Sequence, residues 1–217
     1  MLAASEGSPV LNVLEYALDS EPISCLSASD PLMADLIGQI GSYRLELRDD
    51  RFTALARSIV GQQLSVAAAR TIWSRLVTLL GCVSPEAVMA AEFEQLRGIG
   101  LSNAKANYIR DLSSKVLDGS VDLTTLDSLP DAEAIEELTL IKGVGRWTAE
   151  MFLIFSLGRP DVFSLGDVGL QRAMQAIYGI ERVDVDSLAT AAAAWQPYRS
   201  VASLYLWEAL DRGLLAS

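Results

Sequence analysis

The sequence predicts an all-α protein, and three observations lead to this fold class. Apolar residues recur at the three- and four-residue spacing of a helix in several stretches of the chain. Ser, Asp or Pro, which favour helix starts, precede several of these stretches, and Gly or Pro follows some of them. The N-terminal region lacks the apolar–polar alternation that indicates a half-buried strand.

The helices expected in the N-terminal half begin with residues 10–18, which can pack as a short helix. Ser-Asp-Pro at 29–31 opens a second helix over residues 32–40, because proline suits the first helical position. Asp-Asp at 49–50 can cap a third helix. Its core face has the spacing i, i+3, i+4, i+7, i+8 and consists of Phe52, Leu55, Ala56, Ile59 and Val60.

A polar segment at 61–65, Gly-Gln-Gln-Leu-Ser, interrupts the helical pattern. Ser65 can cap the next helix, over residues 66–80. That helix is expected to bury Ala69, Ile72, Trp73, Leu76, Val77 and Leu80. On composition alone, the segment 61–65 is a connector between two helices.

A Gly-Ile-Gly turn at 98–100 precedes another predicted helix, over residues 103–117. Lys105, Arg110 and Lys115 are expected to point outward from this helix. For Arg110 and Lys115 we favour an ordinary solvated surface. Lys105 lies near the helix start, where the dipole also attracts anions, and is the better candidate for a phosphate contact.

The C-terminal half repeats this turn as Gly-Val-Gly at 143–145. A helix over 132–138 leads into it, and an apolar helix over 147–157 follows and stops at Gly158. The remaining expected helices begin at Asp167, span 184–195 and span 201–214. Glycine permits close backbone approach, and the helix start after the turn presents N–H groups that can hold a phosphate. Plain helix connectors also use such turns, so the turn alone leaves both interpretations open.

Composition excludes several classes of protein. Because the chain has no histidine, His-based triads and His-ligated zinc sites are excluded. Its two cysteines, Cys25 and Cys82, form no disulfide framework and are too few for a four-cysteine iron–sulfur cluster. We find no apolar run of the roughly 18 residues that span a membrane and no basic start of a signal peptide.

The net charge of −11 argues against nucleic-acid binding if the chain is taken as a whole. The charge is uneven, however. Residues 1–50 hold two basic and nine acidic side chains, whereas residues 51–115 hold eight basic and four acidic ones. Because salt screens fields beyond about 10 Å, the local balance matters most. We therefore expect a modest DNA affinity that depends strongly on salt.

Between residues 49 and 210 the chain resembles the helix-hairpin-helix (HhH-GPD) DNA glycosylase superfamily, and within it the 3-methyladenine DNA glycosylase II branch. The matching motifs are the Gly-Val-Gly turn with Trp-Thr-Ala at 147–149, Gly-Asp at 166–167, and Trp-Gln-Pro-Tyr-Arg-Ser at 195–200. The resemblance implies a two-lobed helical fold with a DNA cleft between the lobes and no N-terminal β domain.

The same resemblance implies a division of the chain into three parts. Residues 1–48 are expected to form a helical segment that packs on the second lobe. Residues 49–130 would form the lobe with the 61–65 loop and the Gly-Ile-Gly turn. Residues 131–217 would form the lobe with the helix-hairpin-helix, Asp167 and the C-terminal helices.

Roles for single residues follow from matching positions. Asp167 matches the catalytic carboxylate of the superfamily, although an Asp at a helix start is most often an ordinary cap. Trp147, Met151 and Tyr198 match the base pocket, although Trp147 also suits a helical core. Relatives place Tyr at the position of Met151 and often Trp at the position of Tyr198.

The remaining implied sites contact the DNA backbone or bind a cation. Gln63 or Leu64 would fill the gap that a flipped nucleotide leaves. The phosphate beside the lesion would be held by Lys142, Gly143, Gly145, Arg146 and Thr148, with Lys105 as a further contact. Backbone carbonyls of Thr139, Ile141 and Val144 would bind a structural monovalent cation, and no other cofactor is expected.

The implied activity is monofunctional excision of alkylated bases, such as 3-methyladenine and 7-methylguanine, from damaged double-stranded DNA in base excision repair. Relatives that also cut the strand carry a lysine where this chain has Trp147, so no Schiff base is expected. A glycosylase for oxidised or deaminated bases and a non-catalytic DNA-binding module are the alternatives. We expect a monomer without a membrane partner, in the bacterial cytoplasm at the nucleoid or in a eukaryotic nucleus.

Overall fold

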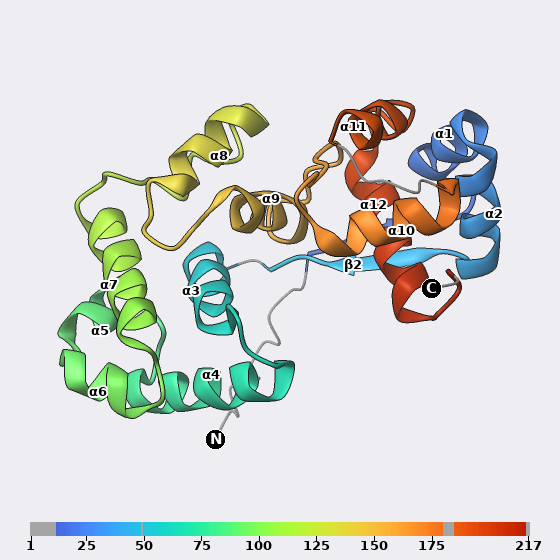
Figure 1. Cartoon of the computed structure of the whole chain (residues 1–217). Coiled ribbons are helices and arrows are strands. Elements are labelled where there is room, and N and C mark those ends of the chain that lie inside the picture. Colours follow the sequence, from blue (N-terminus) through green and yellow to red (C-terminus); the bar gives the residue numbers. More distant parts are fainter. Residues whose placement is uncertain (1–11, 49, 180–184, 216–217) are drawn as a thin grey trace, which may run out of the picture. The chain divides into compact units, whose positions relative to one another are not determined.

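Helices make up most of the computed structural model, which describes residues 12–48, 50–179 and 185–215 (Figure 1). This confirms the all-α fold class. The described residues divide into two units. The terminal unit combines Met1–Asp49 with Leu157–Ser217, and the central unit is Asp50–Ser156. Within the described residues, no helix is both long and apolar enough to cross a membrane.

The first boundary, at 49/50, lies within one residue of the expected 48/49, whereas the second lies at 156/157 instead of 130/131. The helix-hairpin-helix segment belongs to the central unit, where α8 (Asp131–Thr139) packs on α9 (Arg146–Phe155) and α9 contacts α3 (Arg51–Gly61). The chain enters the terminal unit after α9, at Leu157. The next residue, Gly158, has a φ of +66° and lies against leucine side chains of that unit.

The helix expected over residues 10–18 is wrong for the part that the structure describes. β1 (Val13–Tyr16) is a strand that pairs antiparallel with β2 (Tyr43–Glu46), with Val13 opposite Glu46. Val and Tyr favour strands, and β2 alternates a buried Leu45 with exposed neighbours. The pairing of two distant segments therefore overrides a weak helical pattern. Val10 and Leu11 lie outside the described residues.

The terminal unit is built around its last helix. Its helices are α1 (Glu21–Ser29), α2 (Pro31–Ile40), α10 (Val168–Tyr178), α11 (Val185–Ala193) and α12 (Arg199–Asp211). α12 packs against α10 and α2, and its middle, including Tyr205 and Leu206, is fully buried. The sequence predicted α2, and it predicted α10 with Asp167 at its start, but it did not anticipate α1. Asp184, expected at the start of α11, lies outside the described residues.

Asp30 forms hydrogen bonds to α2 and to the C-terminal segment of the terminal unit, Leu157–Ser217. It caps α2, accepting hydrogen bonds from the N–H groups of Leu32 (2.9 Å) and Met33 (3.2 Å). Its other oxygen accepts from the Tyr178 hydroxyl and from Trp195 Nε1. Burial opposes ionisation of Asp30, but these hydrogen bonds outweigh it and lower its pKa.

The central unit contains seven helices among its described residues. Besides α3, α8 and α9 they are α4 (Val66–Leu80), α5 (Pro85–Ala90), α6 (Phe93–Gly98) and α7 (Asn103–Leu117). α7 packs against α5, α3 and α6 (Figure 1). The sequence did not predict α5 and α6 as helices.

The two predicted core faces of this unit fared differently. Every residue of the predicted face of α3 is buried. On α4 only Leu76 is buried, and Val77 remains 38% exposed. α4 packs chiefly against α3, and the remaining predicted core residues, Ala69, Ile72, Trp73 and Leu80, are half-buried.

Candidate functional site

The hairpin turn between α8 and α9 requires glycine at position 143 for two reasons. Gly143 has a φ of +83°, a conformation that L-residues with a side chain rarely adopt. A Cβ at this position would also overlap the Tyr108 ring of α7. The turn is closed by a hydrogen bond from Val144 N–H to the Ile141 carbonyl at 3.0 Å. The backbone at Gly143 is thus fixed in place.

The start of α9 has no side-chain cap. Its N-cap residue is Gly145, and a Cβ there would meet nothing within 4 Å. The first N–H groups of a helix lack partners within the helix, so this open start can receive an anion. The Gly-Ile-Gly turn differs, because Ser102 Oγ caps α7 by accepting from Lys105 N–H at 3.2 Å. The two turns share a sequence pattern but only the second leaves its helix uncapped by a side chain.

Two basic side chains flank the hairpin turn, and each has a carboxylate partner. Lys142 Nζ lies 3.3 Å from Asp111 Oδ1, and Arg146 Nε lies 2.8 Å from Glu150 Oε1. Their side chains are nevertheless 71% and 77% exposed. Burial opposes ionisation of Asp111, but hydrogen bonds from its lysine partners prevail and lower its pKa. Both cations therefore remain accessible at the surface beside the uncapped helix start.

The 61–65 segment forms the loop between α3 and α4, which we call the wedge loop. Gln63 has a φ of +56°, in the left-handed region that non-glycine residues seldom occupy. Gln63 and Leu64 are both exposed. Gln62 instead turns inward, and its Nε2 donates to the Gly143 carbonyl at 2.7 Å. The loop is therefore bonded directly to the hairpin turn.

Lys105 does not point outward as the sequence predicted. Its Nζ donates to the carbonyls of Val60 (2.8 Å) and Gln62 (2.5 Å), at the end of α3. Burial lowers the pKa of this ammonium group. Its position in the structure corresponds to a support of the wedge loop rather than to a surface phosphate contact.

A pocket of about 400 Å³ lies between the wedge loop and the start of α9. Its lining residues are Ser58, Gly61, Gln62, Gln63, Trp147 and Thr148. It thereby brings together Gln63, Trp147 and Thr148, which were predicted in separate roles. Trp147 is 47% exposed, so it is not a core residue, whereas Thr148 is buried. Met151 lies one turn further along α9, half-buried, and is not among the lining residues.

Asp167 lies in the terminal unit at the start of α10. It is the N-cap of that helix, and its Oδ1 accepts from Leu170 N–H at 2.8 Å. The same oxygen accepts from Trp207 Nε1 of α12 at 3.0 Å. The residue is only 9% exposed. Asp167 is therefore a helix cap, as one interpretation of the sequence predicted. Its carboxylate is also held by a second donor, from a helix 40 residues further along the chain.

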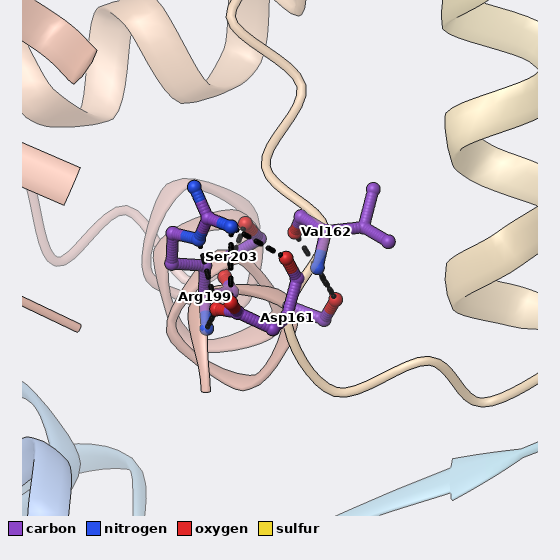
Figure 2. A network of polar contacts seen from close by, with 5 residues as sticks. Asp161, Val162, Arg199 and Ser203 are labelled. Atoms are coloured by element: carbon purple, nitrogen blue, oxygen red, sulfur yellow. Dashed lines mark hydrogen bonds and ion pairs between the residues drawn. The ribbon is translucent and has the colours of Figure 1, made fainter. Parts of the chain in front are cut away.

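The loop that precedes Asp167 is anchored to the start of α12. Arg199 Nε and Nη2 donate to the two carboxylate oxygens of Asp161 at 2.8 and 3.0 Å (Figure 2). Ser200 Oγ accepts from Val162 N–H at 2.8 Å. Closer to the carboxylate, Asp167 N–H donates to the Ser164 carbonyl at 3.1 Å. These bonds fix the loop at several points between Asp161 and Asp167.

Tyr198, the remaining predicted pocket residue, is the N-cap of α12 and half-buried. Burial and the nearby Glu21 carboxylate raise the pKa of its hydroxyl. It shares the terminal unit with Asp167, whereas Trp147 and Met151 belong to the central unit.

Comparison with known proteins decides the family. Residues 56–198 match the model of the HhH-GPD superfamily of base excision DNA repair proteins. The chain belongs to this superfamily. The matched range includes the wedge loop, the hairpin and Asp167.

Three relatives illustrate the similarity. The crystal structure of a DNA-3-methyladenine glycosidase from Bacillus halodurans is 41% identical, with a TM-score of 0.84 over 90% of this chain and 92% of that chain. The Schizosaccharomyces pombe 3-methyladenine DNA glycosylase Mag1, in complex with abasic DNA, is 27% identical, with a TM-score of 0.78 over 88% and 97%. The Escherichia coli DNA-3-methyladenine glycosylase 2 is 27% identical over 84% of this chain and 67% of its own length.

Sequence reasoning missed three residues that hold the site. Gln62, Arg199 and Trp207 each bond to a partner far along the chain, so no local pattern marks them. Gln62 belongs to the Gly-Gln-Gln-Leu-Ser segment at 61–65, and Arg199 to the Trp-Gln-Pro-Tyr-Arg-Ser motif at 195–200. Their positions in these motifs are the only indication that the sequence gives for these two residues. Trp207 lies in a predicted helix and has no such signal.

Proposed function

We propose that this protein is a monofunctional DNA glycosylase that hydrolyses the N-glycosidic bond of alkylated bases in double-stranded DNA. The proposed substrates are 3-methyladenine, 7-methylguanine and similar lesions, and the process is base excision repair. Membership of the HhH-GPD superfamily and the activities for which its relatives are named support this choice. The observation that carries it is the nearly buried Asp167, whose carboxylate is fixed by two N–H donors.

The chemistry assigned to Asp167 follows from charge. Breaking the bond between base and sugar develops positive charge on the sugar, as in the oxocarbenium-like transition state of glycoside hydrolysis. A fixed carboxylate stabilises this charge and orients the attacking water, at little reorganisation cost. Donors on Oδ1 also keep the carboxylate in one rotamer.

Base recognition is assigned to the pocket beside the wedge loop. An alkylated purine is cationic, and the face of an aromatic ring attracts a cation by about 0.5–2 kcal/mol. Trp147 is the exposed aromatic residue that lines this pocket, and pockets of about 300–1,000 Å³ suit small ligands. The resemblance to the superfamily also assigns Met151, on the same helix as Trp147, and Tyr198 to base recognition.

The absence of strand cleavage is proposed from the chemistry of one position. A lyase needs an amine that attacks the sugar and forms a Schiff base. The residue two positions after Gly145 is Trp147, which has no amine. The ammonium group of Lys105 is bonded to the carbonyls of α3. We therefore propose that the product is an abasic site.

DNA is bound in this proposal by the hairpin and the wedge loop. The N–H groups at the start of α9, with Lys142 and Arg146, hold a phosphate without reading sequence. Gln63, or Leu64 beside it, fills the gap in the stack while the base is flipped out. We propose that the protein acts as a monomer.

A structural monovalent cation at the hairpin also remains a proposal. The carbonyls of Thr139, Ile141 and Val144 belong to the same turn. The Ile141 carbonyl already accepts the Val144 N–H, but a carbonyl oxygen has a second lone pair for a cation. The donor set, neutral oxygens only, therefore fits an alkali cation.

A lesion panel tests the proposed function. Duplexes carrying 3-methyladenine, 7-methylguanine, 8-oxoguanine or uracil are incubated with the full chain and then treated with or without alkali. We expect strand breaks for the alkylated bases only, and only after alkali. Cleavage of the 8-oxoguanine or uracil duplex alone would favour a glycosylase for oxidised or deaminated bases. Binding without any cleavage would favour a non-catalytic module.

A further inference from the structure

One face of α7 contacts both of the elements to which the proposed function assigns DNA binding. Lys105, Tyr108 and Asp111 are spaced three residues apart and so share this face. Lys105 bonds to the end of α3 at the wedge loop, and Tyr108 and Asp111 lie under the hairpin turn. We propose that α7 is a platform that fixes the wedge loop relative to the hairpin, with Lys105 as its positioning residue. This inference rests on the proposed function.

The contact with the wedge loop is made by a cation at a helix end. Lys105 Nζ donates to the Val60 and Gln62 carbonyls, which α3 leaves without partners at its C-terminus. The negative end of the helix dipole adds to the attraction. Gln62 directly precedes Gln63, so the two bonds fix the backbone from which the wedge residue projects.

The contact with the hairpin uses a ring and a carboxylate. The Tyr108 ring occupies the space where Gly143 would carry a Cβ. Asp111 Oδ2 accepts from the Lys142 N–H at 2.9 Å, and its Oδ1 lies 3.3 Å from Lys142 Nζ. Lys115 Nζ, one turn further along α7, holds the same carboxylate at 2.6 Å. The residues that open the turn are therefore seated on α7.

A third contact closes the arrangement. Gln62 Nε2 donates to the Gly143 carbonyl, so the wedge loop and the hairpin also bond to each other. Gln63 occupies a left-handed conformation, which costs of order 1–3 kcal/mol and persists only where the surroundings enforce it. The bonds from Lys105 and Gln62 on its N-terminal side are the enforcing contacts that the structure shows.

The platform has a functional consequence because flipping a base out of the duplex needs two contacts at a fixed distance from each other. The hairpin holds the phosphate, and the wedge loop fills the space that the flipped base leaves in the stack. A misplacement of about 1 Å can lower the reaction rate roughly 100-fold. Lys105→Met keeps the length of the side chain but loses both hydrogen bonds. We expect its single-turnover excision of 7-methylguanine, at saturating enzyme, to fall about tenfold or more.

Arg110→Met is the matched control, since it removes the same charge from the same helix. Arg110 Nη1 donates to the Ala91 carbonyl, away from the wedge loop and the hairpin, so the rate is expected to stay within about twofold of the wild type. Both variants should bind the duplex with equal affinity and equal salt dependence. Lys105→Arg should recover most of the rate, because its guanidinium retains donors for the two carbonyls.

The opposite result would assign Lys105 to a phosphate. In that case Lys105→Met would weaken DNA binding, reduce the salt slope by about one, and leave the rate at saturation unchanged. This outcome would overturn the platform.

Amide hydrogen exchange of the free protein separates the platform from the proposed function. The N–H groups of Gln62 and Leu64 bond to the carbonyls of Ile59 and Gly61 and report on the wedge loop. We expect faster exchange at 61–65 in Lys105→Met and no change in Arg110→Met. If the wild type excises no lesion yet this exchange difference is found, the platform stands and the proposed function fails. Unchanged exchange at 61–65 would contradict the platform whatever the activity.

Discussion

At the scale of single residues, the two glycines of the hairpin turn face different demands. Gly143 combines a φ of +83° with a Tyr108 ring in the place of its missing Cβ, whereas Gly145 has a φ of −91° and open space around it. The first is required by the fold of the turn. The second leaves room for a ligand at the start of α9.

Gly143→Ala is therefore expected to lower the free energy of unfolding by about 2 kcal/mol or more, because both strain and overlap arise. Gly145→Ala should leave stability within about 0.5 kcal/mol but weaken DNA binding, since its methyl group blocks the approach of a phosphate. Urea denaturation and fluorescence anisotropy with a duplex measure the two effects. Equal losses of stability in both variants would contradict this assignment.

Asp167 and Trp207 show what the sequence could indicate about single residues. Asp167 was predicted because it follows the hairpin within a recognisable motif and begins a helix. Its bond to Trp207 joins residues 40 positions apart, through the packing of α10 on α12, which no local pattern encodes. The sequence could therefore single out Asp167 as a candidate, but it could not indicate the residue that bonds to it.

Trp207→Phe keeps an aromatic ring and removes the N–H that Asp167 Oδ1 accepts. We expect the single-turnover excision rate to fall about tenfold, since a hydrogen bond to a charged group contributes about 1.5–3 kcal/mol. DNA affinity should not change. Trp73→Phe on α4, a tryptophan of the central unit, serves as the control and should retain the wild-type rate. A wild-type rate in Trp207→Phe would show that the indole does not position the carboxylate.

At the scale of elements, helices with a cap and a covered apolar face were predicted well, and elements that depend on distant partners were not. α3 has both signals, and its whole predicted face is buried. β1 was predicted as helix because Val13–Tyr16 becomes a strand only by pairing with β2, some thirty residues on. α4 also has the cap and the periodicity, but these patterns do not predict how much of its surface other helices cover.

The wedge loop yields a prediction in which stability and activity change in opposite directions. Gln63→Gly removes the strain of a left-handed residue and should raise the free energy of unfolding by about 1 kcal/mol. The same change removes the side chain that is proposed to fill the gap, so base flipping should decline. Thermal melting and the fluorescence of 2-aminopurine next to the lesion measure these effects.

Gln63→Ala is the matched variant, since it removes the amide but keeps the strain. It should flip bases as poorly as Gln63→Gly without the gain in stability. If both variants flip the base as the wild type does, the wedge is not Gln63, and Leu64 becomes the residue to test.

At the scale of the whole molecule, the chain interleaves its two units. The terminal unit joins the first 49 residues to Leu157–Ser217, and local patterns along the sequence do not indicate that these segments share a core. The charges follow the same division. The central unit has ten basic and thirteen acidic residues, and the terminal unit has seven and fifteen. The unit with the hairpin is thus the less acidic one, which agrees with its proposed contact with DNA.

Asp30 makes the stability of the terminal unit sensitive to acid. Its pKa is lowered in the folded state, so the unfolded chain binds protons more readily and the stability from Asp30 is complete only above its unfolded pKa of about 3.8. As pH falls below that value, this contribution is lost. Asp30→Asn should therefore be less stable at pH 7 and should show a weaker fall in stability between pH 5 and pH 2.5.

Urea denaturation at several pH values measures this difference. Asp161→Asn is the comparison variant, because it removes a different carboxylate of the same unit, the partner of Arg199. Parallel pH profiles for wild type and Asp30→Asn would contradict the role of Asp30 as the ionised acceptor at the centre of this unit.

The most direct measurement compares the wild type with Asp167→Asn on a duplex that contains 7-methylguanine. Asparagine keeps the size of the side chain and an oxygen for Leu170 N–H and Trp207 Nε1, but it cannot stabilise a cationic sugar. We expect unchanged binding and a single-turnover rate at least about 100-fold lower, consistent with loss of one preorganised electrostatic group. Equal excision by the two proteins would contradict the account, because the carboxylate would then have no part in the reaction.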